Sequence, residues 1–393
     1  MKKKIAILGS TGSIGKTLLK IIEKDKKNFE IVLLTANKDH KTLLKQAIKF
    51  NVKNLILTNE NNFKILKKKT KKKNIKIFNS FNNIKKILNN KIYYTMSSIV
   101  GIEGLDPTFR IIKHTRNIAI ANKETIVCGW SIIKKELNKY KTHFIPVDSE
   151  HFSLWYGLKN LDYKTVENIY LTASGGPFYN EPLKNFKKIN VKKALNHPNW
   201  KMGKKISVDS ATMINKVYEV IEAKNIFQIP YKKIKILIHP KSYIHCLIKF
   251  NNGLTKIIVH DTTMKIPIFN TLYNKFNRYL KSNPIDIFKL NKLNLNNVDL
   301  KRYPMVSILK ILPKKNSLFE TVIVSANDTL VNLFLNKKIK FVDLYNDLIK
   351  FITHKEFIKY KNKSPKNVED IVELNNYVRS KILKKVYKTE NAK

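Results

Sequence analysis

Cysteine, arginine, glycine and long apolar runs are all scarce in this 393-residue chain, and each shortage excludes a class of protein. Two cysteines, Cys128 and Cys246, are too few for a disulfide framework or a clustered cysteine metal site. The apolar runs fall short of the roughly 20 residues that a membrane helix needs. The apolar stretch Ile5–Leu8 is too short for the core of a signal peptide. We therefore expect a cytoplasmic protein without a membrane partner.

Negative charge is scarce as well. The sequence has 76 lysines and arginines against 29 aspartates and glutamates, which gives a net charge of +47. Such a charge is a common sign of nucleic-acid binding. However, only five of the basic residues are arginine, the side chain best suited to reading bases and phosphates. We interpret the charge as a compositional bias on solvated surfaces and expect no nucleic-acid partner; steeply salt-dependent binding to duplex DNA would favour the alternative.

The apolar pattern predicts an α/β protein. Short apolar strands alternate with helical periodicity over residues 1–148, which predicts a mostly parallel, doubly wound Rossmann-type domain that binds a dinucleotide. The expected strands are residues 5–8, 31–35, 54–58, 93–99, 117–121 and 143–147, with helices between them, one of which begins near Lys41.

Three further regions follow. Residues 149–273 are expected to form an α+β domain that contains strands 168–172 and 235–238, a hairpin of strands 244–250 and 254–259, and a helix over 210–227. The polar, asparagine-rich stretch 274–302 is interpreted as a linker. Helical periodicity predicts an α-helical domain over residues 303–393.

The few glycines are concentrated in short motifs. Three of the 11 recur every third residue in Gly9–Gly15, between a predicted strand and a predicted helix, which is a variant of the dinucleotide-binding fingerprint. The glycines allow a tight turn, and the helix N-terminus offers N–H groups to a pyrophosphate. After the second strand, Asn37 and Lys38 suit a ribose 2′-phosphate, whereas Asp39 does not. The sequence thus favours NADP over NAD.

Two carboxylates follow the strand 143–147. Asp148 and Glu150 stand two residues apart at the carboxyl edge of the predicted sheet, where ligands of such sheets bind. Close carboxylates repel each other unless a cation or proton neutralises them, and oxygen ligands favour magnesium or manganese over zinc. The alternative is a solvated acidic turn in which Asp148 caps a helix. We interpret His151 as a packing or supporting residue.

A second group of polar residues lies between 172 and 219. Gly175 and Gly176 would let their loop present N–H groups and the Ser174 hydroxyl to an anion, although a plain glycine turn would also explain them. The loop that contains His197 and Trp200 predicts a mobile lid over about residues 197–205.

The following helix carries more of these groups. Asn215, Lys216 and Glu219 share one broad helical face, and Ser210 is placed near the helix N-cap. Their residue types fit a phosphate clamp with one carboxylate ligand. The alternative is a capping serine and an ordinary exposed face.

Six motifs in order give the chain a family resemblance: GSTGSIG, ANKE, PVDSEH, SGGPF, HPNWKMGKKISVDSATMINK and HPKSYIH. Over about residues 5–328 they resemble the 1-deoxy-D-xylulose 5-phosphate reductoisomerase family. The resemblance implies a homodimeric oxidoreductase that uses NADPH and a divalent cation (Mn²⁺, Mg²⁺ or Co²⁺). Its reaction would rearrange and reduce this phosphorylated sugar to 2-C-methyl-D-erythritol 4-phosphate, in the non-mevalonate route to isoprenoid precursors.

The resemblance also implies a role for each matching position. The implied cofactor contacts are Thr11, Gly12, Ser13, Ile14, Asn37, Lys38, Asp39, Asn122, Glu124 and Gly203. The implied substrate contacts are Lys123, Ser149, Glu150, Ser174, His197, Ser210, Asn215, Lys216 and Glu219. The implied metal ligands are Asp148, Glu150 and Glu219, which form the catalytic set together with Lys123, a hydrogen-bond donor near the reacting oxygens. Trp200 matches the aromatic residue of the lid.

Several positions depart from the family pattern. Phe152, Val217, Lys241 and Thr263 replace the usual residues, which bears on turnover and lid closure, and Asp39 should weaken the preference for NADPH over NADH. Two enzyme alternatives stay open. One is another NAD(P)-dependent sugar-phosphate or homoserine-type dehydrogenase, which would need no metal-binding carboxylates. The other is an enzyme of this fold that has decayed to low activity.

Overall fold

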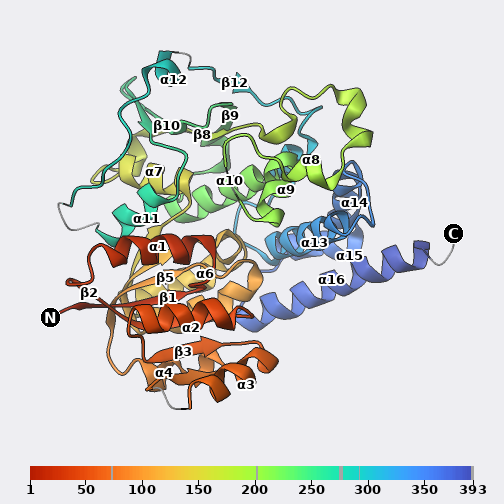
Figure 1. The fold of residues 1–393 in the computed structure, drawn as a ribbon. Helices are drawn as coiled ribbons and strands as arrows, with labels where there is room; N and C mark the ends of the chain where they lie inside the picture. The colour runs from red at the N-terminus through yellow and green to blue at the C-terminus, as the bar shows by residue number, and fades with distance from the viewer. Residues whose placement is uncertain (72–73, 201, 274–277, 292, 391–393) are drawn as a thin grey trace. The chain divides into compact units, whose positions relative to one another are not determined.

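The computed structural model describes residues 1–71, 74–200, 202–273, 278–291 and 293–390 (Figure 1). The chain divides into two compact units. The first consists of Met1–Thr125, Ile132–Phe152 and Met264–Lys281, and the second of Ile126–Ser131, Ser153–Thr263 and Ser282–Lys393. The first unit therefore extends the predicted domain 1–148 by a segment from much later in the chain. The expected α-helical domain over 303–393 and the expected α+β domain over 149–273 contribute to one unit.

A seven-stranded parallel sheet forms the centre of the first unit, with strand order β4-β3-β2-β1-β5-β6-β7. The strands are β1 Lys3–Leu8, β2 Phe29–Ala36, β3 Asn54–Leu57, β4 Lys76–Phe78, β5 Ile92–Ser97, β6 Thr115–Ile120 and β7 His143–Pro146. The predicted doubly wound α/β fold is confirmed. Only β4 was not expected, because this strand has three residues and no buried side chain.

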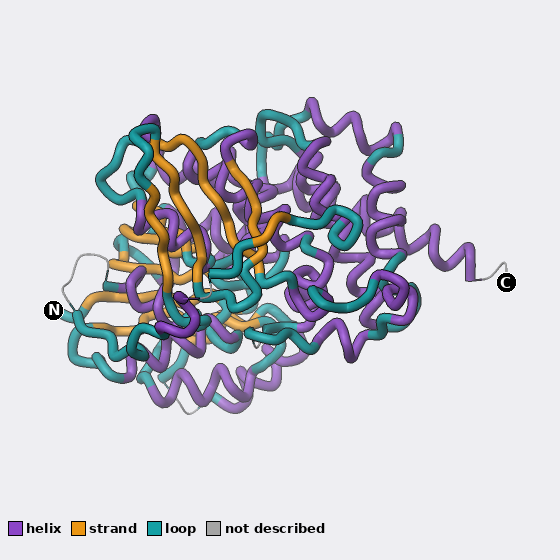
Figure 2. Tube along the Cα trace, turned by 90° about the horizontal axis from the view of Figure 1, so that it is seen from above, coloured by secondary structure: helices purple, strands orange, loops and turns teal. Residues whose placement is uncertain are grey.

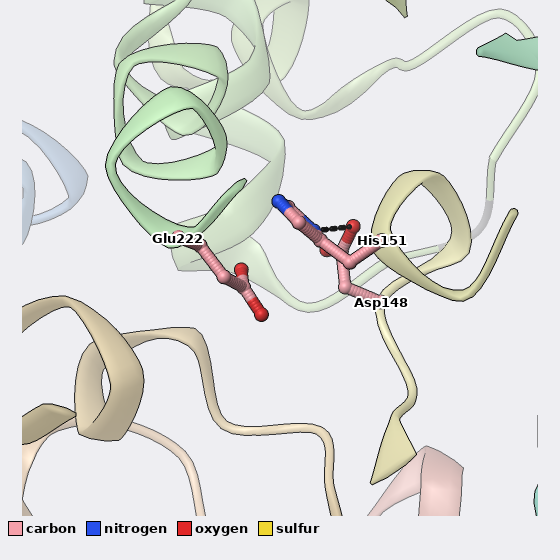
Figure 3. Close-up of side chains that lie close together, drawn as sticks. All are labelled: Asp148, His151 and Glu222. Carbon is pink, nitrogen blue, oxygen red and sulfur yellow. Dashed lines mark hydrogen bonds and ion pairs between the residues drawn. The ribbon is translucent and has the colours of Figure 1, made fainter. Parts of the chain in front are cut away.

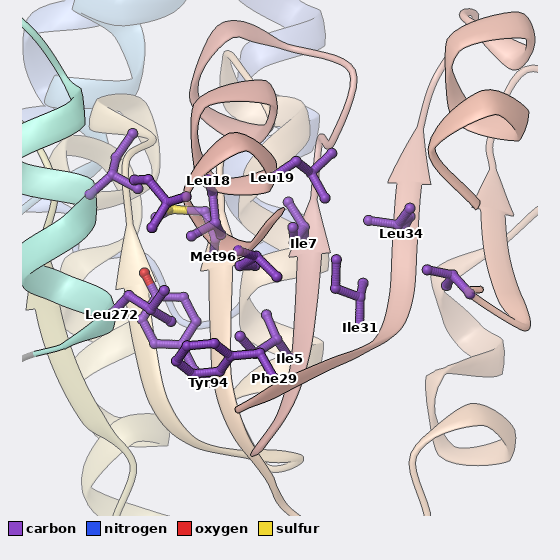
Figure 4. Close-up of a cluster of buried hydrophobic side chains, with 14 of the residues drawn as sticks. Ile5, Ile7, Leu18, Leu19, Phe29, Ile31, Leu34, Tyr94, Met96 and Leu272 are labelled. Atoms are coloured by element: carbon purple, nitrogen blue, oxygen red, sulfur yellow. The ribbon is translucent and has the colours of Figure 1, made fainter. Parts of the chain in front are cut away.

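The helices of the first unit follow its strands: α1 Ser13–Glu23, α2 His40–Lys49, α3 Glu60–Lys69, α4 Ile84–Ile87, α5 Leu105–Ile112, α6 Lys123–Lys139 (in part) and α11 Lys265–Leu272. Figure 4 shows the core in which α1 and α11 meet the sheet, with Ile5, Ile7, Leu18, Tyr94, Met96 and Leu272 among its side chains. The hydroxyl groups of Tyr94 and Thr271 lie 2.9 Å apart inside this core. This packing places α11 in the first unit rather than in the predicted second domain.

The sheet of the second unit is mixed. Its order is β11-β10-β8-β9-β12, and only β8 and β9 are parallel neighbours. Figure 2 shows the strands of the protein in orange and its helices in purple. The strands are β8 Val166–Ala173, β9 Ile234–Ile238, β10 Ile244–Phe250, β11 Thr255–Val259 and β12 Asn296–Asn297. The antiparallel pair of β10 and β11 confirms the predicted hairpin. The strand β12 and the helix α12, Ile287–Asn291, lie in the stretch that the sequence analysis interpreted as a linker.

The remaining α-helices of the described residues are α7 Ser149–Gly157, which begins in the first unit, and α8 Val191–Leu195, α9 Lys204–Thr212, α10 Ile214–Phe227, α13 Leu318–Leu335, α14 Asp343–Ile352, α15 Lys355–Ile358 and α16 Val368–Glu390 in the second. The single helix predicted over 210–227 is wrong. Met213 has a left-handed backbone, with φ +65°, which separates α9 from α10. Ser210 therefore lies inside α9 and is not an N-cap.

Of the described helices, α13 alone is long and apolar enough to cross a membrane, and 83% of its apolar window is buried inside the structure. Its N-terminus carries a capping box in which Ser317 and Glu320 bond each other's backbone. Burial on this scale is that of a core helix.

Candidate cofactor and active site

The turn between β1 and α1 can be built only with glycine at two positions. At Gly9, where φ is +80°, a Cβ atom would lie 2.8 Å from the carbonyl oxygen of Ser98. At Gly15, it would lie 2.5 Å from the Cα atom of Ser10. Side chains at these positions would collide with backbone, so the glycine spacing seen in the sequence is a packing requirement of this strand–turn–helix unit.

The N-terminus of α1 fits a phosphate group. None of the described side chains caps this helix at its N-cap residue, Gly12, so its first N–H groups can bind an anion. Gln46 stabilises the turn through two contacts with Ser10. Its Nε2 donates to the Ser10 carbonyl oxygen at 2.9 Å, and its Oε1 lies 2.8 Å from the Ser10 hydroxyl oxygen. The exposed residues Gly12 and Ser13 complete a site suited to a pyrophosphate.

In the segment after β2, Asp39 has a structural role as a helix cap. Its carboxylate accepts a hydrogen bond from the Thr42 backbone N–H at 3.0 Å and thereby caps α2. That hydrogen bond holds the pKa of Asp39 below its ordinary value. Asn37 donates to the Thr58 hydroxyl at 2.8 Å, and Lys38 is exposed beside it. The unusual acidic residue thus starts a helix within the segment predicted to receive a 2′-phosphate.

Asn122 fixes the start of α6. Its side-chain oxygen accepts a hydrogen bond from the Thr125 backbone N–H at 2.7 Å, while its amide nitrogen donates to the carbonyl oxygens of Ile99 and, at 2.7 Å, Gly101. These bonds join the end of β6 to the loop after β5. They set the position of the next residue, Lys123, at the carboxyl edge of the sheet.

Lys123 and Asp148 meet at that edge, at the ends of neighbouring strands. The Lys123 ammonium lies 3.0 Å from one oxygen of Asp148. The His151 Nδ1 atom lies 2.9 Å from the other oxygen, and Figure 3 shows this contact. All three side chains are largely buried, at 9%, 16% and 0% exposure. The Ser149 hydroxyl donates to Glu150 at 2.6 Å. His151 thus supports Asp148, as expected, and a positive charge already stands beside this carboxylate.

In the second unit, the glycine loop after β8 packs against α9. Gly175 and Gly176 have φ values of +80° and +64°, and a Cβ atom at Gly176 would lie 3.0 Å from the Ser210 carbonyl oxygen. The Gly176 N–H donates to the Ser174 hydroxyl at 2.9 Å. The loop therefore brings the backbone of Ser210 next to Ser174. Both serines are among the expected substrate contacts.

The imidazole of His197 adjoins the same loop, with Nε2 3.0 Å from the Ser174 hydroxyl oxygen. Its Nδ1 atom accepts hydrogen bonds from the backbone N–H groups of Asn199, at 3.2 Å, and Trp200, at 3.0 Å. Burial lowers the pKa of His197 to about 4. The ring is therefore neutral at pH 7 and carries its proton on Nε2.

Three polar side chains on α10 bond one another, which confirms the shared helical face. Asn215 donates to one oxygen of Glu219 at 2.6 Å, and the Lys216 ammonium donates to the other. Lys216 and Glu219 are almost wholly buried, at 4% and 2% exposure. A buried carboxylate with a paired ammonium is not an ordinary solvated helix face.

Comparison with known proteins resolves what these features have in common. A family model described as 1-deoxy-D-xylulose 5-phosphate reductoisomerase matches residues 5–129, and models of C-terminal domains of that enzyme match residues 144–227 and 260–381. The reductoisomerase of Pelagibacter ubique is 59% identical over 382 residues, which cover 97% of this chain and 98% of that protein. The chain belongs to the 1-deoxy-D-xylulose 5-phosphate reductoisomerase family.

Other members support this assignment. The enzyme of a Sulfurihydrogenibium species is 36% identical over 91% of this chain and 92% of its own length. The solved structure of the Zymomonas mobilis enzyme with NADPH matches with a TM-score of 0.86 at 29% identity, over 96% of this chain and 97% of that one. A reductoisomerase complex with NADPH, fosmidomycin and magnesium matches with a TM-score of 0.90 at 27% identity, over 99% of both chains. The sequence resemblance is confirmed.

The other family positions also have defined places. Gly203 is the exposed N-cap residue of α9, and Glu124 lies buried in the first turn of α6. The predicted lid includes residue 201, which lies outside the described residues. Sequence reasoning missed the supporting roles of Gln46 and Asn199. Asn199 stands inside the quoted HPNW motif, whereas Gln46 has no sequence signal.

Proposed function

We propose that this protein catalyses the NADPH- and divalent-cation-dependent conversion of 1-deoxy-D-xylulose 5-phosphate to 2-C-methyl-D-erythritol 4-phosphate, a step toward isoprenoid precursors. The observation that carries the proposal is the 59% identity, over 97% of the chain, to a protein named for this activity. Asp148, Glu150 and Glu219, the proposed metal ligands, are all carboxylates, and Lys38 and Lys216 carry positive charge where phosphate groups are proposed to bind.

The proposed cofactor site follows the turn after β1. Thr11–Ile14 would receive the pyrophosphate of NADPH, and Asn37 and Lys38 its 2′-phosphate. The uncapped helix N-terminus and the exposed lysine support this assignment. Asp39, Asn122, Glu124 and Gly203 are proposed as further cofactor contacts. When bound, NADPH supplies the hydride for the reduction.

Asp148, Glu150 and Glu219 are the proposed metal ligands, and their oxygen-only donor set fits Mg²⁺, Mn²⁺ or Co²⁺. A bound cation would stabilise negative charge on the ketone and hydroxyl oxygens of the substrate. In the structure, lysines neutralise two of these carboxylates: Lys123 at Asp148 and Lys216 at Glu219. With a cation at these carboxylates, Lys123 would be available to donate hydrogen bonds to the reacting oxygens of the substrate.

The proposed substrate site also includes Ser149 and a phosphate clamp made of Ser174, His197, Ser210, Asn215 and Lys216. Hydroxyl, amide and imidazole groups would donate hydrogen bonds, and Lys216 would supply charge. A firmly held phosphate keeps the carbon fragments in place while one carbon–carbon bond breaks and another forms. We also propose that Trp200 covers bound substrate, and that the protein works as a homodimer in the cytoplasm.

The test is NADPH oxidation followed by absorbance, with 1-deoxy-D-xylulose 5-phosphate and with or without Mn²⁺. Oxidation that needs the metal and yields methylerythritol phosphate is the expected result. No oxidation by a protein that still binds NADPH would refute the substrate assignment. Oxidation at the same rate after chelation would refute the metal site and revive the alternative of a metal-independent dehydrogenase.

A further inference from the structure

The HPKS turn that follows β9, His239–Ser242, has no part in the function argued so far. Its Ser242 N–H donates to the His239 carbonyl oxygen at 2.9 Å. Ser242 has a φ of +50°, a left-handed conformation that is uncommon for residues other than glycine, and it is only 8% exposed. A backbone conformation of this kind persists only where its surroundings hold it.

Asn199 bonds this turn with both hydrogens of its side-chain amide. Its Nδ2 atom donates to the Pro240 carbonyl oxygen at 2.5 Å and to the Ser242 hydroxyl oxygen at 3.0 Å. The left-handed turn thus presents a carbonyl oxygen and a hydroxyl oxygen to one amide group. The loop that carries His197 is fastened at this point to a turn from a different part of the second unit.

This fastening determines which nitrogen of His197 carries the proton. The backbone N–H groups of Asn199 and Trp200 both point at Nδ1, at 3.2 and 3.0 Å. Only an unprotonated Nδ1 can accept from two donors, so the proton must sit on Nε2, which faces the Ser174 hydroxyl at 3.0 Å. Burial, which lowers the pKa of His197 to about 4, keeps the ring neutral.

We propose that Asn199 is a positioning residue for substrate recognition: by holding the loop on the HPKS turn, it fixes His197 as a neutral Nε2–H donor to the substrate phosphate. The proposal rests on the proposed function, in which His197 contacts that phosphate. The proposal also assigns a role to the HPKS motif, because the carbonyl oxygen of Pro240 and the hydroxyl oxygen of Ser242 accept the two hydrogen bonds of the Asn199 amide group.

Steady-state kinetics provide the first test. Asn199→Ala should raise the KM for 1-deoxy-D-xylulose 5-phosphate by about tenfold or more, as expected for a misplaced binding group, while the KM for NADPH stays within about twofold. Asn185→Ala is the matched control, because Asn185 is a half-buried asparagine of the same unit that bonds Glu181 at 2.7 Å instead. Ser242→Ala should give a smaller rise and add nothing to Asn199→Ala, since both act through one amide.

The second test needs no turnover. Nitrogen-15 NMR of histidine-labelled full-length protein, with His197→Gln to assign the signal, should show the Nε2–H tautomer in the parent and a tautomer mixture in Asn199→Ala. An unchanged tautomer, or an unchanged KM for the sugar phosphate, would overturn the positioning role. If the parent itself fails to oxidise NADPH with this substrate, the proposed function fails, and the tautomer comparison still decides whether Asn199 governs His197.

Discussion

Replacement of Glu320 by glutamine should flatten the pH dependence of the protein's stability. The carboxyl group of Glu320 is wholly buried at the start of α13, where one oxygen accepts from the Ser317 N–H at 3.1 Å and the Ser317 hydroxyl at 2.6 Å. The other oxygen has no hydrogen-bond partner among the described residues. Burial raises the pKa of Glu320 from 4.5 to about 7, against the opposing effects of Ser317 and of the Lys224 ammonium.

The size and sign of the effect follow from that shift. Below pH 4.5, the carboxyl is protonated in the folded and unfolded chain alike, and its stabilising effect is fully present. As the pH rises toward 7, the unfolded chain releases a proton that the folded chain retains, and stability falls by about 1.4 kcal/mol per pH unit. Between pH 5 and pH 8, the loss amounts to about 2 to 3 kcal/mol. A glutamine cannot titrate, so Glu320→Gln should escape this loss.

Urea unfolding of the parent and of Glu320→Gln, followed by circular dichroism at pH 5, 6, 7 and 8, measures the effect as the difference between the two free energies of unfolding. Glu167→Gln serves as a control, because Glu167 is 40% exposed and pairs with Lys249 on the surface. The reasoning is refuted if the difference between parent and Glu320→Gln stays constant over this range, since the buried carboxyl would then titrate alike in both states.

Three further substitutions test the proposed sites. Glu219→Gln should abolish turnover and weaken Mn²⁺ binding in calorimetry, with little change in NADPH affinity; turnover at the parental rate would disprove the metal assignment. Gly15→Ala should lower the free energy of unfolding, measured by urea titration, by about 1–3 kcal/mol, because the new Cβ atom would collide with the backbone. Gly12→Ala is the control: its Cβ atom would have its nearest neighbour at 3.4 Å, so this variant should keep the parental free energy of unfolding. Asp39→Asn keeps a helix cap and removes a negative charge, so it should lower the KM for NADPH several-fold; an unchanged KM would place the 2′-phosphate elsewhere.

Local pattern was enough to predict most of the first unit. Strands β1 and β2 contain the short apolar runs Ile5–Leu8 and Ile31–Leu34, and such runs alternate with helices of clear periodicity. That order alone implies a parallel sheet. Strand β4 could not be found this way, because its three residues include no buried side chain and therefore form no apolar run. The break at Met213 was equally hidden, since a left-handed methionine interrupts a stretch whose apolar periodicity continues.

In the candidate site, too, some contacts could be predicted from the sequence and others could not. The contacts of Asn215 and Lys216 with Glu219 were foreseeable, since they follow from helical spacing along a single element. The hydrogen bonds of Asn199 were not foreseeable, because they reach residues about 40 positions away. Those residues lie on a turn whose conformation the sequence does not indicate. Chemistry that stands on one element can be predicted from sequence, whereas the supports that join elements depend on the fold.

The return of α11 to the first unit affects how the chain can fold during its synthesis. Ile268 and Leu272 of this helix are wholly buried against the first strands, and Tyr273 donates a hydrogen bond to Asp25 at 2.8 Å. A ribosome must therefore translate most of the chain before the nucleotide-binding sheet can cover its apolar face. Until then, the nascent protein exposes apolar side chains that include Tyr94 and Phe29, and transiently exposed apolar surface of this kind is prone to aggregation.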